Sequence, residues 1–221
     1  MTSVEWKVPA ADGQTTAVYE EAASGNAVFV CAHGAGGNVA DRSTLATARA
    51  LRAEGIGVVR FNFLYREKKS ARPDRMPLLM ETFAAVVAHA RAKLAPERLV
   101  IGGRSMGGRA ASMLAADGYD ADGLLLLAYP LHPPGKPEQL RDAHLPRIRM
   151  PVLCFNGTRD PFCTRDLMQR ALESVTAPWE MHWVEGADHS FHVPKSSGRT
   201  DAEVLAGIAG VSRDWIARMS A

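Results

Sequence analysis

The sequence predicts an α/β fold in which a mostly parallel, twisted sheet carries helices on both of its faces. Several short runs, such as residues 27–32, are apolar throughout, as expected of strands that are buried on both faces. These runs alternate with segments of helical periodicity, and that order requires a largely parallel sheet. The length of 221 residues suits one core, so residues 1–221 are predicted to form a single domain.

The chain is expected to begin with a hairpin, in which segments 5–8 and 15–20 flank the turn residues Asp12-Gly13. The strands expected after it are residues 27–32, 58–63, 98–101, 123–129, 152–156 and 179–184. The expected helices are residues 41–54, 77–94, 106–117, 164–175 and 201–219, the last with a clear apolar stripe.

Two stretches are predicted to be irregular. Residues 64–76 form a basic, polar loop, which either meets an anionic substrate or is simply a solvated loop. Residues 130–150 are rich in proline, with a possible short helix at 138–142. Because that interval is too short for a helical cap domain, we expect no cap over the sheet edge.

Composition excludes several classes of function. The net charge of +2 and the 23% of charged residues give no reason to expect a nucleic-acid or membrane partner. The N-terminal residues 1–9 lack an apolar signal core. Three cysteines cannot all pair, and Cys31 and Cys154 lie in strand-like runs, which favours buried free thiols. We therefore expect a cytoplasmic protein.

The segment Gly103-Arg104-Ser105-Met106-Gly107 matches the pattern G-x-S-x-G between an expected strand and an expected helix. In this pattern a serine sits on a strained turn, and its hydroxyl is exposed at the carboxyl edge of the sheet. Glycines on either side allow strand and helix to cross closely. Ser105 is therefore the candidate nucleophile.

A serine nucleophile needs a base, and the base needs a carboxylate that fixes its tautomer. Asp160, which follows the strand at 152–156, is the preferred acid over Asp188. Its alternative role is to cap the next helix. His189, which follows the last strand, is the preferred base over His192. The order Ser105, Asp160, His189 is that of the triad associated with G-x-S-x-G.

An oxyanion formed at Ser105 needs backbone donors. The predicted donors are the N–H of Met106 and the N–H of Ala35, with Gly36 as the second choice for the latter. The glycine-rich loop at 33–37 matches no nucleotide-binding motif. The chemistry requires no cofactor and no metal.

These motifs resemble the α/β-hydrolase superfamily. More narrowly, segments 103–109, 129–137 and 156–162 resemble a subgroup containing bacterial hydrolases, the testis-expressed protein 30 and a subunit of an animal histone acetyltransferase complex. The resemblance implies the α/β-hydrolase fold and the chemistry of a serine hydrolase; together with the short interval at residues 130–150, which leaves no room for a cap domain, it predicts a lidless serine hydrolase. It implies no substrate.

The function expected from the sequence is that of a carboxylesterase acting on small or flexible acyl esters. A thioesterase, a peptidase, or a non-catalytic interaction module that retains the fold are the alternatives, and a protein partner stays possible. Six residues are assigned to the substrate pocket, although Tyr129 is equally explained as a core residue: His33, Gly34, Arg104, Tyr129, Leu131 and His132.

Overall fold

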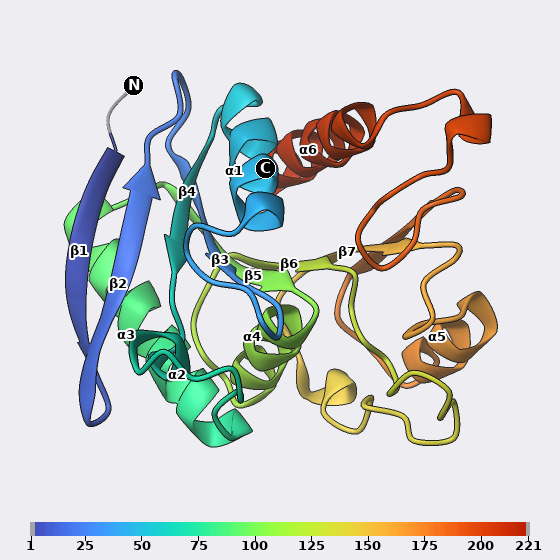
Figure 1. The fold of residues 1–221 in the computed structure, drawn as a ribbon, viewed down its shortest axis with the longest axis horizontal. Helices are drawn as coiled ribbons and strands as arrows, with labels where there is room; N and C mark the ends of the chain where they lie inside the picture. The colour runs from blue at the N-terminus through green and yellow to red at the C-terminus, as the bar shows by residue number, and fades with distance from the viewer. Residues whose placement is uncertain (1–2, 220–221) are drawn as a thin grey trace.

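The computed structural model describes residues 3–219, which form one eight-stranded sheet between two layers of helices (Figure 1). The strands are β1 (Ser3–Ala10), β2 (Gly13–Glu20), β3 (Ala27–Ala32), β4 (Ile56–Phe61), β5 (Arg98–Arg104), β6 (Gly123–Leu127), β7 (Val152–Gly157) and β8 (Trp179–Val184). The helices are α1 (Arg42–Ala53), α2 (Leu64–Glu67), α3 (Met76–Leu94), α4 (Met106–Ala116), α5 (Arg165–Leu172) and α6 (Asp201–Arg218). Two 3₁₀ turns, η1 (Leu145–Arg147) and η2 (Lys195–Ser197), complete the described elements.

The sheet has the strand order β1-β2-β4-β3-β5-β6-β7-β8. Strands β3 to β8 pair in parallel, and the β1–β2 hairpin joins β4 antiparallel. The predicted fold class is therefore confirmed. Because the carboxyl ends of all the parallel strands meet at one edge, the loops that follow β3, β5, β7 and β8 gather there.

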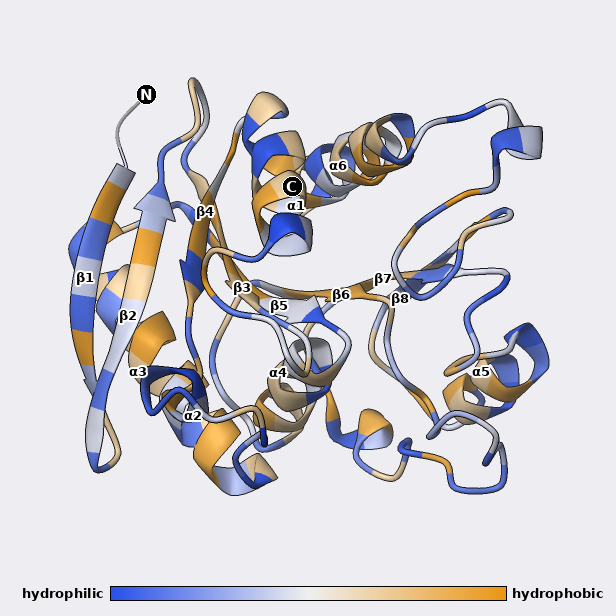
Figure 2. Cartoon of the chain, in the orientation of Figure 1, coloured by the Kyte–Doolittle hydropathy of each residue, from blue (hydrophilic) through white to orange (hydrophobic). Residues whose placement is uncertain are grey.

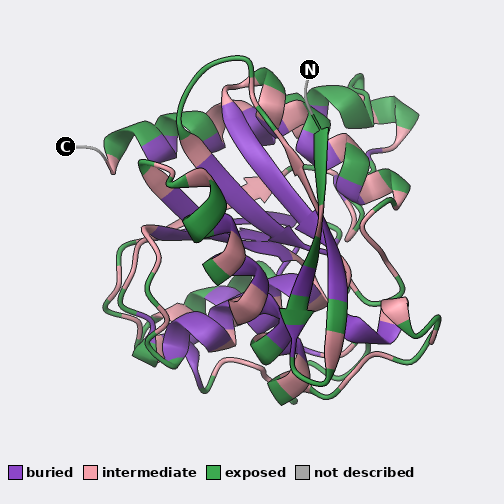
Figure 3. Ribbon diagram, turned by 90° about the vertical axis from the view of Figure 1, so that its left-hand side faces the viewer, coloured by how far each residue is buried: buried purple, intermediate pink, exposed green. Residues whose placement is uncertain are grey.

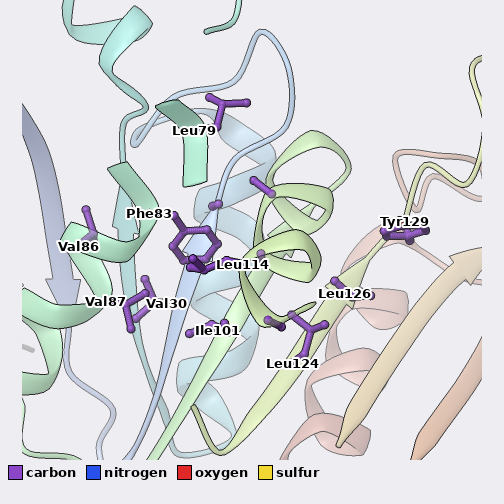
Figure 4. Close-up of a cluster of buried hydrophobic side chains, with 14 of the residues drawn as sticks. Val30, Leu79, Phe83, Val86, Val87, Ile101, Leu114, Leu124, Leu126 and Tyr129 are labelled. Atoms are coloured by element: carbon purple, nitrogen blue, oxygen red, sulfur yellow. The ribbon is translucent and has the colours of Figure 1, made fainter. Parts of the chain in front are cut away.

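Each face of the sheet has its own hydrophobic core. Helices α1 and α6 cover one face, whereas α3 and α4 cover the other (Figure 1). Adjacent strand residues serve opposite faces: Ile101 packs with Phe83 of α3, and Val100 packs in the cluster of α1 and α6. Figure 4 shows the core on the face that α3 and α4 cover. This arrangement explains why the central strands are apolar (Figure 2) and buried (Figure 3), whereas β1 is largely exposed.

Three local predictions need correction. In the hairpin, Gly13 pairs with Ala10, so the loop is Ala11-Asp12 rather than Asp12-Gly13. Residues 64–67 form α2 instead of loop, because Leu64 and Tyr65 are buried and anchor the segment. The possible helix at 138–142 is absent from the described chain, and the only helical turn between β6 and β7 is η1. The prediction that no cap domain is inserted there is confirmed.

All three cysteines are buried and unpaired, as predicted for Cys31 and Cys154. Burial raises the pKa of the Cys31 thiol to about 12, so this thiol stays protonated and unreactive at neutral pH. Among residues 3–219, no helix is both long enough and apolar enough to cross a membrane.

A buried polar cluster holds the β6–β7 connection against α4. His144 Nε2 lies 2.7 Å from Ser112 Oγ, and the Ser112 hydroxyl donates to the carbonyl of Arg109 at 2.9 Å. Burial, followed by the positive charges of Arg109 and Arg147, lowers the pKa of His144 to about 4. His144 is therefore neutral at physiological pH, and the folded state resists its protonation.

We expect this histidine to make the protein less stable in acid. The unfolded chain protonates His144 near its ordinary pKa of 6.5 while the folded chain does not, so stability falls as pH drops from 6.5 toward 4. Between pH 7 and pH 5 the loss is about 2 kcal/mol. Urea unfolding at both pH values should show that His144→Gln removes this part of the pH dependence. The partly exposed His182 provides the control, and an equal effect of His182→Gln would contradict the assignment.

Candidate active site

Ser105 lies in a strained turn between β5 and α4. Its backbone angles are φ 50° and ψ −117°, a conformation that costs energy in a non-glycine residue. Hydrogen bonds hold the turn, because the Ser105 amide donates to the carbonyl of Leu127 at 2.9 Å and the Arg109 amide donates to the carbonyl of Ser105 at 2.9 Å. The side chain makes no capping bond to α4 and is left for other partners.

Close packing of α4 on the sheet explains the glycine that follows. A Cβ atom on Gly107 would lie 2.6 Å from the carbonyl oxygens of both Ala32 and His33, at the end of β3. No real side chain tolerates that approach, so any larger residue would push α4 away from β3. Gly107 thus fixes Ser105 beside the loop that follows β3.

His189 stands between Ser105 and Asp160 in one chain of hydrogen bonds. His189 Nε2 is 2.9 Å from Ser105 Oγ, and His189 Nδ1 is 2.8 Å from Asp160 Oδ2. The His189 side chain is 20% exposed and that of Asp160 is fully buried. Because a carboxylate only accepts hydrogen bonds, Nδ1 carries the proton and Nε2 is left to accept from the serine hydroxyl.

The loop after β7 holds the carboxylate from several sides. Asp160 Oδ2 also accepts from Asn156 Nδ2 at 3.1 Å, and Oδ1 accepts from the Phe162 amide at 2.9 Å. A Cβ atom on Gly157 would lie 2.7 Å from the carbonyl oxygen of Asp188, so this glycine lets the loops after β7 and β8 touch. The contact brings Asp160 within reach of His189.

The two rival residues have other partners. The Asp188 carboxylate accepts from the amides of Ser190 at 2.6 Å and His192 at 3.0 Å, so it shapes the turn. His192 Nδ1 pairs with Asp201 Oδ2 at 2.9 Å on the surface, and this pairing raises the pKa of His192. Of the two candidate pairs, the structure brings Asp160 and His189 to Ser105.

The loop after β3 passes directly over the nucleophile. A Cβ on Gly34 would lie 3.5 Å from Ser105 Cβ, and Ala35 lines the cavity beside Ser105. Met106 is the first residue of α4, and the first amides of a helix have no acceptor within it. Gly36 turns the loop with a φ of 79°. Both predicted oxyanion donors thus lie on the segments that border Ser105.

His33 holds this loop from beneath rather than lining the pocket. It is buried, with Nδ1 2.8 Å from the carbonyl oxygen of Gly34, and Nε2 accepts from the amide of Phe63 at 3.2 Å. Burial lowers the pKa of His33, which keeps the ring neutral and both bonds intact. The assignment of His33 to the pocket wall is corrected to a support of the loop that follows β3.

The cavity at Ser105 has a volume of about 410 Å³. Two of the predicted pocket residues, Gly34 and Arg104, contribute to its wall. Apart from the proposed triad and oxyanion donors, the other lining residues were not predicted from the sequence. They come from the loop after β3, the start of α1, and the loops after β7 and β8: Gly37, Asp41, Ser43, Phe162 and Ser190.

Within residues 3–219, the residues that line this cavity do not include Tyr129, Leu131 or His132. All three are buried; Figure 4 shows Tyr129 among the core side chains, and its hydroxyl donates to the carbonyl of Arg141 at 2.7 Å. The segment turns inward after β6 because the hydrogen bonds of Asn156 hold the Tyr129 backbone. Their assignment to the pocket wall is therefore replaced by a role in the core.

Asn156 is a residue whose role the sequence analysis did not identify. It is fully buried; Oδ1 accepts from the Tyr129 amide at 3.2 Å, and Nδ2 donates to the Tyr129 carbonyl at 3.0 Å as well as to Asp160. Its signal in the sequence is weak, namely a polar side chain at the end of an apolar strand. The residue ties the end of β6 to the carboxylate.

We expect Asn156→Leu to lower both stability and turnover. The change leaves two buried backbone groups of Tyr129 unpaired and removes one of the three hydrogen bonds to Asp160, at a cost of about 2–4 kcal/mol in unfolding free energy. Turnover at a temperature where both proteins are folded should fall about tenfold, because Asp160 is less firmly oriented. Urea unfolding and steady-state kinetics measure the two effects. Unchanged kcat in the folded variant would contradict the positioning role.

A parallel sheet with a serine on a strained strand-to-helix turn defines an α/β-hydrolase type of protein. A family model described as an alpha/beta hydrolase domain matches residues 25–217, and the chain belongs to this family. The narrower subgroup suggested by the three sequence segments stays a prediction.

Solved structures agree with the fold. An α/β serine hydrolase homologue from Coxiella burnetii is 20% identical with a TM-score of 0.78, over 96% of this chain and 98% of that one. A Xanthomonas campestris member of the α/β serine hydrolases, described as without a lid, is 22% identical with a TM-score of 0.77, over 97% and 95% of the two chains. A dienelactone hydrolase from Anabaena variabilis is 17% identical with a TM-score of 0.77, over 98% and 97%.

Proposed function

We propose that this chain is a serine hydrolase that cleaves carboxylic esters of small molecules by acyl transfer. The observation that carries the proposal is the continuous hydrogen-bond chain Ser105–His189–Asp160 at the carboxyl edge of the sheet. A surface serine without a catalytic role does not require hydrogen bonding to a mostly buried imidazole that is in turn bonded to a fully buried carboxylate. Membership in the α/β-hydrolase family supports the same chemistry.

In the proposed reaction, Ser105 Oγ attacks the ester carbonyl carbon while His189 Nε2 takes the hydroxyl proton. The negative charge that develops on the carbonyl oxygen is stabilised by the N–H groups of Met106 and Ala35. His189 then gives its proton to the leaving alcohol, and an acyl-Ser105 ester remains. A water molecule, deprotonated by His189, attacks this ester; the acid is released as the bond to Ser105 Oγ breaks, and His189 returns the proton to Oγ. Asp160 holds the ring and stabilises its charged form throughout.

The walls of the site favour small or flexible acyl groups. The β6–β7 connection, which lacks any helix longer than η1, packs against α4 and the loop after β7 instead of covering Ser105. The His132 amide donates to the carbonyl of Phe162 at 3.0 Å, and the Phe162 ring lies 4.3 Å from that of His189. Phe162 thus supplies an aromatic wall next to the base.

The test is a panel of substrates with one acyl group and different leaving groups: an oxygen ester, a thioester and an aminoacyl amide. We expect the highest kcat/KM for the oxygen ester and loss of all turnover in His189→Gln, with His192→Gln as the matched control that retains turnover. A preference for the thioester or the amide would replace the esterase with a thioesterase or a peptidase. No turnover and a constant protein partner would indicate an interaction module.

A further inference from the structure

Arg104 stands where two hollows of the surface meet. The cavity at Ser105, about 410 Å³, and a second hollow of about 570 Å³ between α1 and α6 share three lining residues: Ser43, Arg104 and Ser190. The second hollow continues to Arg42 and Thr47 of α1 and to Leu205 of α6. A groove therefore leads from the nucleophile past the Arg104 side chain.

The guanidinium of Arg104 has donors to spare. One of its five N–H groups donates to the carbonyl of His189 at 2.6 Å, and Cζ lies 5.8 Å from the centre of the Phe191 ring. Among residues 3–219, no carboxylate lies within ion-pair distance of it. Within residues 3–219 its other N–H groups make no hydrogen bond, and Arg104 lines both hollows.

The nearest acidic side chains act on Arg104 only through space. Asp41 already accepts from Ser43 Oγ at 2.7 Å and from the Thr44 amide at 2.9 Å, and Asp188 is bound to the amides of its own turn. Burial lowers the pKa of Arg104, and the charges of Asp41, Asp188 and Asp160 oppose that shift. A partly desolvated cation without a direct counter-ion is costly unless a ligand supplies one.

We propose that Arg104 binds a carboxylate group of the substrate, so that the esters cleaved at Ser105 are monoanions with the carboxylate a few bonds from the scissile ester. The inference rests on the proposed function and deepens it. The carboxylate site lies close to the scissile ester, because Arg104 precedes Ser105 in the chain and donates a hydrogen bond to the carbonyl of His189. The nearby Asp41 and Asp188 favour a single negative charge over a doubly charged phosphate, which they would repel.

A purely structural role of Arg104 predicts a different result. Its bond to His189 and its contact with Phe191 hold the loop after β8, and their loss lowers turnover of every ester by the same factor. Recognition of a carboxylate instead changes the ratio of kcat/KM between an anionic ester and its neutral isostere. The ratio is therefore the measurement that separates the two roles.

The experiment uses two matched pairs of substrates. Monomethyl glutarate and methyl glutaramate differ only in a carboxylate or carboxamide on the acyl side, and acetoxyacetate and acetoxyacetamide differ in the same way on the alcohol side. We expect wild type to prefer the anion at least about tenfold in one pair, the size of a charge-assisted hydrogen bond. In Arg104→Gln the ratio should fall to about one, and Arg104→Lys should keep part of it because the charge remains.

Arg149→Gln is the control for the loss of one positive charge, because Arg149 is exposed in the loop just before β7, on the opposite edge of the sheet. The ratio of kcat/KM between the anionic ester and its neutral isostere should be the same in Arg149→Gln as in wild type. Three results overturn the proposal: a ratio near one in wild type for both pairs, an unchanged ratio in Arg104→Gln, or an equal fall in Arg149→Gln.

A fluorophosphonate probe, which reacts with an activated serine whatever the substrate, separates failure of this proposal from failure of the hydrolase assignment. A labelled wild type with a ratio of one in both pairs refutes only the carboxylate site. An unlabelled, folded wild type without turnover refutes both.

Discussion

Replacing Ser105 with alanine is expected to lower kcat for ester hydrolysis by about 10⁴- to 10⁶-fold, the loss that removal of a triad nucleophile produces. The fold should persist, because the turn is held by the backbone bonds to Leu127 and Arg109 and not by the Ser105 hydroxyl. Steady-state kinetics with a short acyl ester measure the first effect. Thermal unfolding measures the second, with Tm expected to stay within about 2 °C.

Ser112 provides a matched control, because it also hydrogen-bonds a histidine. Its Oγ lies 2.7 Å from His144 Nε2, but Ser112 is a buried residue of α4, His144 is also buried, and neither lines the cavity at Ser105. Ser112→Ala should keep kcat and lose about 1–3 kcal/mol of stability, since a buried ring nitrogen loses its partner. Full activity of Ser105→Ala, or loss of turnover only in Ser112→Ala, would contradict the assignment of the nucleophile.

The second large effect is expected from Asp160→Asn, with a fall in kcat of about 10⁴-fold. The amide would favour the tautomer of His189 that carries its proton on Nε2, and such a ring cannot accept the serine proton. The nearly equal size of the two side chains should preserve the fold and the bond from the Phe162 amide, whereas the NH2 group that faces His189 can no longer accept from Asn156 Nδ2. Kinetics of the purified variant, with circular dichroism as the check on folding, measure the loss.

Asp188→Asn is the corresponding control, since this aspartate is the rival acid and adjoins His189 in the sequence. Its bonds to the Ser190 and His192 amides need only an acceptor oxygen, which asparagine retains. We expect kcat to change by less than about threefold. A collapse of activity in Asp188→Asn, with Asp160→Asn still active, would reverse the assignment of the acid.

The sequence was most informative where a chemical requirement is local. The spacing around Ser105 requires a tight turn, and the structure supplies the physical reason at Gly107, whose hydrogen occupies space that no side chain can share with β3. Asp160 and His189 could be selected because both follow strands of a parallel sheet, whose carboxyl ends meet at one edge. The location of the site at that edge is predicted by the order of strands and helices along the chain alone.

Side-chain direction after a strand could not be predicted in this way. Tyr129 ends an apolar strand and was equally consistent with pocket or core; the hydrogen bonds of Asn156, from the neighbouring strand, hold its backbone, and its side chain is buried. The role of Asn156 could not be predicted for the same reason, because its hydrogen-bond partner Tyr129 lies far from it in the sequence. Residues 64–67 looked polar, and the burial of Leu64 and Tyr65 that makes them helical depends on contacts with the rest of the fold.

The most direct test of the central claim is covalent labelling of the folded protein with a fluorophosphonate, followed by intact-mass analysis and peptide mapping. We expect one adduct per chain, located on Ser105, absent in Ser105→Ala and strongly reduced in His189→Gln. No adduct on a well-folded wild type, or an adduct on any other serine, would show that the hydrogen-bond chain Ser105–His189–Asp160 does not activate a nucleophile.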